Sequence, residues 1–128
     1  MILLLDTSTA VCKLTLSDGD WRYDDTWQAD RTLAKNLLGY LQEQLKKHNK
    51  TFDDISAIGV FEGPGSFTGL RIGMTVLNTI ANTNQIPIVG ARGDDWIDTA
   101  LQCLRDGQND KIVLPFYGGD AHITKPRK

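Results

Sequence analysis

The sequence predicts a single α/β domain with a mixed five-stranded sheet, and three observations lead to this prediction. Three strand patterns precede the first helix pattern, and after it strands and helices alternate. The 128 residues are typical of one domain and suffice to bury a core without metals or disulfides. Neither an internal repeat nor a linker divides the chain. The expected order of elements is therefore βββαβαβα.

The first 28 residues predict three antiparallel strands. Residues 2–5 are a continuous apolar run, which is typical of a strand buried on both faces. Residues 11–16 alternate between apolar and polar side chains, and residues 21–28 carry three aromatic rings. The pair Asp18-Gly19 between these two runs is a hairpin signal.

A change to helical periodicity follows. Leucines recur at every fourth position from Leu33 to Leu45, which places them on one face of an amphipathic helix over residues 31–48. Asp30 stands just before this run and is a suitable N-cap.

Strands and helices alternate in the rest of the chain. Residues 56–61 predict a buried strand that enters a glycine-rich turn, and residues 68–84 predict the second helix. A short strand at 86–89 leads to a third helix at 94–105, and residues 112–117 are a candidate last strand. Right-handed crossovers after an antiparallel meander give one mixed sheet covered by helices. This layout resembles the RNase H-like, actin-like ATPase domain.

Composition excludes some classes of function. The 14 basic and 16 acidic side chains give a formal net charge of −2, which argues against tight, autonomous binding to a polyanion. Cys12 and Cys103 lack the CxxC spacing and are expected to be reduced structural thiols. The apolar run at residues 2–5 stops at Asp6, so it is too short for a signal peptide or a membrane span. We expect a cytoplasmic protein without membrane contact.

Two loops carry residues that are candidates for binding a metal ion or phosphate. The first is a hydroxyl-rich turn after the first strand, and the second is a glycine-rich turn before the second helix. Their candidate residues are Asp6, Thr7, Ser8 and Thr9 in the first loop, and Gly63, Pro64, Gly65, Ser66, Phe67, Thr68 and Arg71 in and after the second. Carboxylate and hydroxyl groups suit Mg²⁺ and phosphate, but the same groups also satisfy turn backbone, and we favour the turn role.

The glycine-rich turn has two readings as well. Amides at a helix N-terminus can receive phosphate, whereas glycines also permit a sharp strand-to-helix turn that Ser66 or Thr68 then caps. A Walker A loop is excluded because no Lys-Ser/Thr pair follows the glycines. Gly69 and Gly73, one turn apart, predict close approach by another backbone, either from within the chain or from another subunit.

The run LLLDTST at residues 3–9 and the run GPGSFTGLRIG at residues 63–73 resemble the paired signatures of the TsaB family. The second run is highly specific, and IPIVG at residues 86–90 matches the family's usual continuation. The resemblance covers about residues 1–91. It implies a bacterial protein related to TsaD, the enzyme that transfers a threonylcarbamoyl group to the adenosine beside the tRNA anticodon.

The same resemblance implies domain boundaries. Family members usually continue into a second domain, so residues 1–111 are expected to be the N-terminal actin-like domain and residues 112–128 a last strand and basic tail that remain from the second. The family lacks the metal-binding HxxxH motif of TsaD, and so does this chain, whose histidines are His48 and His122. No catalytic residue, metal or cofactor is therefore expected.

The resemblance further implies a partner subunit that binds TsaD through its first two helices. A TsaE-type ATPase is a candidate third member, tRNA is contacted only indirectly, and a homodimer is expected when TsaD is absent. Because of this family pattern, we expect Gly69 and Gly73 to be approached by another subunit. The residues expected at the interface are Leu33, Leu37, Leu41, Gly69, Ile72, Gly73 and Val76.

Two other functions compete with this one. A nucleotide-binding half-domain of the sugar-kinase type would bind Mg-ATP at the Asp6 loop and would need a second chain to close its site. A glycoprotease-like peptidase is disfavoured, because the sequence shows neither zinc ligands nor a nucleophile–base pair.

Overall fold

The computed structural model describes residues 1–116, and it has the predicted mixed sheet of five strands. The strands lie in the order β3-β2-β1-β4-β5, with antiparallel pairing between β1, β2 and β3 and parallel pairing of β1 with β4 and of β4 with β5. Their bounds are Ile2–Asp6 for β1, Val11–Asp18 for β2, Trp21–Gln28 for β3, Ala57–Phe61 for β4 and Ile88–Ala91 for β5.

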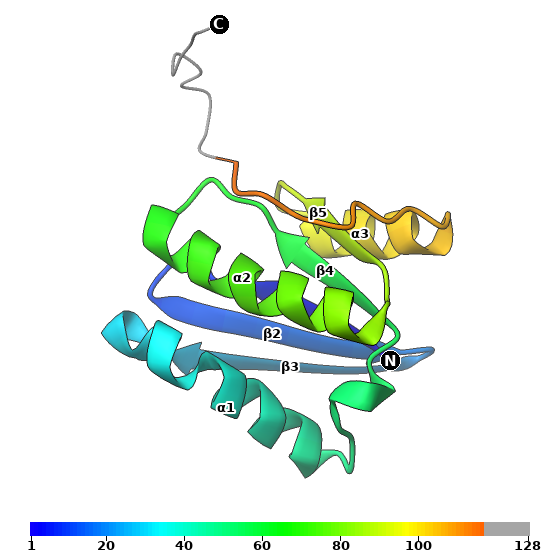
Figure 1. The fold of residues 1–128 in the computed structure, drawn as a ribbon, viewed down its shortest axis with the longest axis horizontal. Coiled ribbons are helices and arrows are strands. Elements are labelled where there is room, and N and C mark those ends of the chain that lie inside the picture. The colour runs from blue at the N-terminus through cyan, green and yellow to red at the C-terminus, as the bar shows by residue number, and fades with distance from the viewer. Residues whose placement is uncertain (117–128) are drawn as a thin grey trace, which may run out of the picture.

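Helices cover both faces of this sheet. Figure 1 shows α1 and α2 lying side by side over one face, with α3 behind the other. The helices span Leu33–Lys47 for α1, Phe67–Asn84 for α2 and Trp96–Arg105 for α3, and short 3-10 turns cover Asp30–Thr32 and Phe52–Asp54. Within residues 1–116, no helix combines the length and apolar character needed to cross a bilayer.

The apolar run of β1 follows from this layering. Leu3 and Leu5 pack into the core beneath α1 and α2, whereas Leu4 packs into the smaller cluster beneath α3. Alternate side chains of a strand point to opposite faces, so a central strand covered on both faces needs apolar residues at every position. All three leucines are almost fully buried.

Aromatic side chains fix α1 to β3. The rings of Trp27 and Tyr40 stack with centroids 4.8 Å apart, and the Tyr40 hydroxyl donates a 2.6 Å hydrogen bond to Asp25 Oδ2. One helical turn further on, the Tyr23 hydroxyl donates to Gln44 Oε1 at 2.9 Å. The aromatic residues Tyr23 and Trp27 of the predicted third strand therefore form the surface against which α1 packs.

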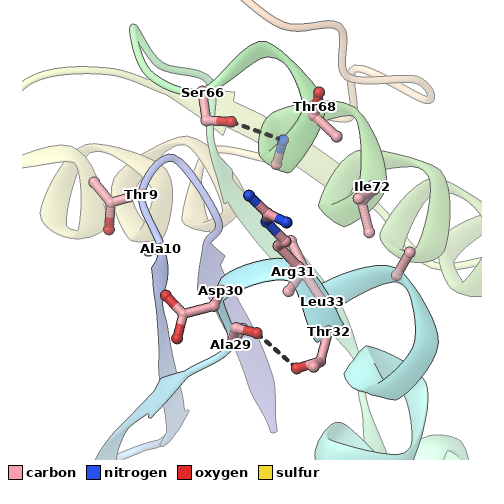
Figure 2. Close-up of a pocket in the computed structure, with 12 residues that line it drawn as sticks. Thr9, Ala10, Ala29, Asp30, Arg31, Thr32, Leu33, Ser66, Thr68 and Ile72 are labelled. Carbon is pink, nitrogen blue, oxygen red and sulfur yellow. Dashed lines mark hydrogen bonds between the residues drawn. The ribbon is translucent and has the colours of Figure 1, made fainter.

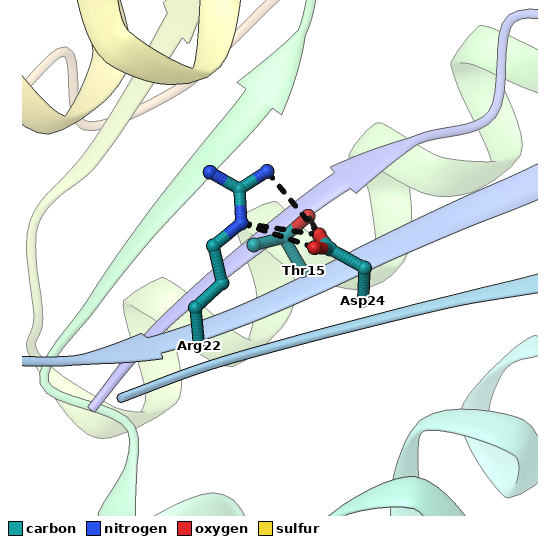
Figure 3. Close-up of polar contacts among 3 residues, drawn as sticks. All are labelled: Thr15, Arg22 and Asp24. Atoms are coloured by element: carbon teal, nitrogen blue, oxygen red, sulfur yellow. Dashed lines mark hydrogen bonds and ion pairs between the residues drawn. The ribbon is translucent and has the colours of Figure 1, made fainter. Parts of the chain in front are cut away.

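The opposite face of the β2–β3 hairpin is polar and carries a cross-strand cluster (Figure 3). The Thr15 hydroxyl donates to Asp24 Oδ1 at 2.6 Å, and Arg22 Nε lies 3.1 Å from Asp24 Oδ2. These contacts hold the pKa of Asp24 below its ordinary value, with the Thr15 hydrogen bond as the largest cause. Half-exposed ion pairs of this kind contribute little to stability, so this cluster adds little to the stability of the hairpin.

The predicted cap of the first helix is wrong. Asp30 was expected to cap the first helix, but it lies inside a 3-10 turn with φ +48° and accepts a hydrogen bond from Gln28 Nε2. Thr32 holds the cap position of α1 without a side-chain capping bond. The extra turn lets the chain leave β3 and change direction before the α-helix begins.

The candidate strand at residues 112–117 is also wrong for the part that the structure describes. Residues 112–116 are not a strand, because Asn78 holds both backbone groups of Val113 with hydrogen bonds of 3.0 and 2.9 Å. The outer edge of β5 is closed instead by the Asn109 side chain and by Asp110. Tyr117 and the basic tail lie outside the described residues.

The two cysteines are free thiols. Cys12 belongs to the core beneath α1 and α2, whereas Cys103 packs against the cluster beneath α3. Burial raises the pKa of the Cys12 thiol to about 12, so this side chain is a neutral core residue at physiological pH.

We predict opposite outcomes for two neighbouring leucines of α1. Leu37→Ala should lower the free energy of unfolding by about 3 kcal/mol, because this side chain is fully buried. Leu38→Ala is the matched control and should change it by less than about 0.5 kcal/mol, since Leu38 is 53% exposed. Urea unfolding followed by circular dichroism measures both, and similar losses in the two variants would contradict the packing described here.

Candidate functional site

The two motif loops meet at one end of the sheet, where β1 turns into β2 and β4 leads into α2. In the first loop, Asp6 Oδ1 accepts a 2.8 Å hydrogen bond from the buried Ser8 N–H. Thr9 Oγ1 accepts from Val11 N–H and donates to Val11 O. Asp6, Thr7 and Ser8 are all buried, and the contacts made by Asp6 and Thr9 agree with the turn role that the sequence favoured.

Thr7 joins the first loop to α2. Its hydroxyl donates a buried hydrogen bond of 2.7 Å to the carbonyl oxygen of Gly69. This bond and the contacts around it draw the backbone of α2 against the β1–β2 turn. A side-chain donor is suitable here because a carbonyl oxygen can accept a second hydrogen bond beside its helical one.

The close approach explains the two helical glycines. A Cβ on Gly69 would overlap the carbonyl oxygen of Thr7, and a Cβ on Gly73 would overlap the Thr7 side chain. The partner predicted to approach these glycines is therefore the chain's own first loop. Gly69 and Gly73 are both buried, which corrects the expectation that they face another subunit.

The second loop is held by the first through its own polar groups. Ser66 N–H donates to the carbonyl oxygen of Ser8 at 2.7 Å, and Ser66 Oγ accepts from Gly69 N–H at 3.1 Å. The predicted Ser66 cap of α2 is thereby confirmed. Gly65 packs so tightly on Ser8 that a Cβ would overlap it, and Gly63 has φ +113°. These contacts assign the glycine-rich turn an architectural role.

A groove opens beside these loops, between the first turns of α1 and α2 (Figure 2). Its larger hollow has a volume of about 800 Å³ and is lined from the 3-10 turn, the start of α1 and the start of α2. A second hollow of about 440 Å³ continues along α2. Ala34, Thr68 and Ile72 line both hollows, so the two form one continuous surface.

Exposed side chains of α2 form one wall of this groove. Phe67 is 50% exposed, and the Arg71 guanidinium lies over its ring at 5.3 Å from the centroid. Ile72 and Val76 are partly exposed and line the second hollow together with Phe67 and Arg71. The expectation that Ile72 and Val76 are available to a partner is therefore compatible with their positions.

The leucine stripe of α1 was expected at the partner interface, and this expectation is wrong. Leu37 and Leu41 are fully buried and Leu33 is 5% exposed, because they face the sheet. Ala34 and Leu38, each one position after a leucine of the buried stripe, are exposed apolar residues of α1. The sequence signal for them was present, since Ala34 and Leu38 are apolar and flank the buried stripe at helical spacing.

The geometry of the two loops gives no support for a metal-binding or phosphate-binding site. No group of three or more His, Cys, Asp or Glu side chains gathers as a metal site within residues 1–116. The hydroxyls and amides of the two loops largely bond to each other, as with Asp6 to Ser8 and Ser66 to Ser8. Pro64 and Thr68 are exposed, and Thr68 lines both hollows of the groove.

Comparison with known proteins matches this region of the chain. The family model described as TsaD, tRNA N6-adenosine threonylcarbamoyltransferase, matches residues 27–93. A protein of that name from Bacillus thuringiensis (strain Al Hakam) is 44% identical over 96 residues, covering 75% of this chain and 28% of the relative. The tRNA threonylcarbamoyladenosine biosynthesis protein TsaB of Escherichia coli (strain K12) is 33% identical over 94 residues, covering 70% and 38%.

Solved structures agree with the fold. YeaZ from Pseudomonas aeruginosa has a TM-score of 0.68 at 27% identity and covers 83% of this chain and 49% of its own. A second structure, described as an uncharacterized protein with similarity to peptidase YEAZ from Pseudomonas aeruginosa, has a TM-score of 0.67 at 30% identity and covers 71% and 42%. The chain thus spans less than half the length of these relatives.

We predict that Gly73→Ala destabilises the protein although alanine is the better helix former. The added Cβ meets the Thr7 side chain, so the free energy of unfolding should fall by about 2 kcal/mol. Gly39→Ala in α1 is the matched control, since its Cβ meets nothing within 4 Å, and it should stabilise by about 0.5–1 kcal/mol. Urea unfolding measures both variants.

A double-mutant cycle tests the cause. In a Thr7→Ala background, the loss in the free energy of unfolding caused by Gly73→Ala should be smaller by about 1 kcal/mol. The reason is that the Thr7 Oγ1 and Cγ2 atoms, which the new Cβ would overlap, are absent. An undiminished cost in that background would show that Thr7 is not the constraint.

Proposed function

The chain belongs to the TsaD family as a TsaB-type protein, and from this premise we propose that it takes part in tRNA threonylcarbamoyladenosine biosynthesis as a non-catalytic partner subunit. In this role it binds a TsaD-type transferase and leaves the chemistry to it. The groove between α1 and α2 is the binding surface, and Ala34, Ile72 and Val76 are its apolar lining. The exposed Leu38 lies one helical turn after Ala34 on α1 and extends this apolar surface.

The observation that carries the proposal is an apolar surface left open between two packed helices. Leu38 and Phe67 expose about half of their area, and Ile72 and Val76 remain partly exposed although they also contact the core. Apolar side chains gathered on one face are typical of a protein–protein contact. The family's most specific sequence run, residues 63–73, lies at this surface.

The internal use of the polar loop groups supports a non-catalytic role. In a phosphate-binding loop, amides and hydroxyls point toward the ligand. In this chain the Thr7 hydroxyl, the Ser66 amide and Asp6 Oδ1 bond to other parts of the same two loops or to α2. These bonds make the first turn a support for α2.

Further assignments follow from the same proposal. The protein acts in the bacterial cytoplasm, where tRNA modification takes place, and a TsaE-type ATPase joins the pair. With a formal net charge of −2, the chain reaches tRNA only through its partner.

We predict that Ala34→Arg abolishes binding to the TsaD-type subunit of the same organism without unfolding the protein. The new side chain fills a position that lines both hollows of the groove, and Ala34 is exposed, so the fold should tolerate it. Thr99→Arg on α3 is the matched control because Thr99 is exposed on the opposite face of the sheet. Calorimetric titration measures both. Equal affinity in the two variants would contradict an interface at the groove.

We also predict that the purified chain neither binds Mg-ATP nor turns it over. This outcome separates the partner-subunit role from the nucleotide-binding half-domain, because the Asp6 turn is closed by internal hydrogen bonds. Calorimetry with Mg-ATP is the measurement. Micromolar binding that Asp6→Asn abolishes, in a variant that stays folded, would favour the half-domain.

A further inference from the structure

A strap of chain at residues 108–116 contacts β5 and α2 before it reaches the glycine-rich turn. Figure 1 shows this segment, in orange, passing from the end of α3 toward the turn between β4 and α2. Asp110 N–H donates to the carbonyl oxygen of Ile88 in β5 at 2.8 Å, and Val113 exchanges two hydrogen bonds with Asn78 of α2. Val113 is 2% exposed and belongs to the core beneath α1 and α2, so the middle of the strap contributes to stability.

The end of the strap makes a different set of contacts. Phe116 N–H donates a 2.8 Å hydrogen bond to the carbonyl oxygen of Glu62, the residue that follows β4. The Arg92 guanidinium lies over the Phe116 ring, 4.0 Å from its centroid. Arg92 Nε also donates to Glu62 Oε1 at 3.1 Å. Each of the three residues therefore contacts the other two, and we call this set the Glu62–Arg92–Phe116 clamp.

The sequence leaves room for the clamp in β5. A Cβ on Gly90 would overlap the Glu62 carboxylate. Glycine inside a strand weakens it and commonly marks a site where another group approaches closely, so the position of the Glu62 side chain explains Gly90. The Arg92 and Glu62 side chains are 51% and 21% exposed. Ion pairs at such exposure add little to stability, so the stability of the fold does not depend on this pair.

The clamp lies directly at the start of the glycine-rich turn. A Cβ on Gly63 would overlap the carbonyl oxygen of Phe116, so the strap packs on the first residue of the turn. The far end of the turn is held by the first loop, because Ser66 N–H donates to the carbonyl oxygen of Ser8. Ser66 also caps α2 and lines the larger hollow of the groove. The turn therefore connects the clamp at one end with the groove at the other.

We propose that Glu62, Arg92 and Phe116 are positioning residues for partner binding, which hold the glycine-rich turn so that the first turn of α2 stands in its binding geometry. The inference rests on the proposed function and adds to it residues that lie outside the binding surface. None of the three lines either hollow of the groove. Their effect on the partner is therefore transmitted through the turn.

A loosened clamp should lower affinity without unfolding the protein. When a binding surface is competent in only a fraction of the molecules, the apparent affinity falls by that fraction. The first loop still holds α2 through Thr7 and Ser8 in such a variant, so the helix stays folded while the turn before it gains freedom. A strap that is purely structural leads to the opposite expectation, in which affinity is lost only as stability is lost.

The experiment pairs calorimetric titration of the full chain against the TsaD-type subunit with thermal melts of each variant. Arg92→Gln and Phe116→Ala should each weaken binding by roughly 3- to 10-fold, while the melting temperature stays close to that of the wild type. Phe116→Tyr keeps the ring and should retain the affinity. The double variant of Arg92→Gln with Phe116→Ala should lose less affinity than the two single losses combined, because the two residues act as one unit.

Two matched controls separate position from stability. Arg22→Gln removes the other ion pair of residues 1–116, whose arginine side chain is 49% exposed, and should leave affinity unchanged. Val113→Ala removes a buried side chain of the strap but keeps its backbone bonds to Asn78. It should lower the melting temperature and leave the affinity of the folded protein unchanged. Hydrogen exchange of the free chain adds a direct readout, since residues 63–69 should exchange faster in the clamp variants than in Arg22→Gln.

Each outcome supports or overturns the inference. Clamp variants that bind like the wild type, while Ala34→Arg loses binding, overturn it and leave the proposed function standing. Affinity losses that follow the melting temperature, in Val113→Ala as in Arg92→Gln, overturn it because the strap is then only structural. Unchanged hydrogen exchange at residues 63–69 in the clamp variants also overturns it, because the clamp then does not hold the turn. A wild type that fails to bind the TsaD-type subunit defeats the proposed function, and the inference with it.

Discussion

The contact between Thr7 and the backbone of α2 is the constraint on which the rest of this structure depends. A hydroxyl on the β1–β2 turn reaches the carbonyl oxygen of Gly69, and the same side chain occupies the space that a Cβ on Gly73 would need. Interiors are packed closely enough that one extra methyl group is resisted. The glycines of α2 thus serve the fold, and their cost in helix propensity is offset by this packing.

Once α2 is held at the turn, the position of the groove follows. The buried leucines of α1 face the sheet, and Tyr40 ties the helix to β3 through Trp27 and Asp25. The two helices therefore rest on different strands of the same sheet, and their first turns leave a hollow between them. The groove results from where the sheet places its two covering helices.

This arrangement separates stability from recognition within each helix. Along α1, Leu37 is buried whereas Leu38 is exposed, so adjacent residues serve the core and the surface. Along α2, Gly73 meets Thr7 while Ile72 lines the groove. A helix presents several faces at once, and for that reason the most specific sequence run of the chain combines architectural glycines with surface residues.

The sequence by itself determined the strand order of the meander, the three helices and the identity of the two motif loops, because periodicity and turn chemistry are local properties. It also indicated that a backbone approaches Gly69 and Gly73. Only the tertiary structure decided that the approaching residue is Thr7, with its backbone at Gly69 and its side chain at Gly73, because these contacts join residues more than 60 positions apart. The same holds for residues 112–116, where Asn78 takes the backbone groups of Val113 that a strand would have used. Helical spacing gave α1 an apolar stripe, but whether a stripe faces a sheet or a partner depends on what lies beneath the helix, and this is fixed by long-range packing.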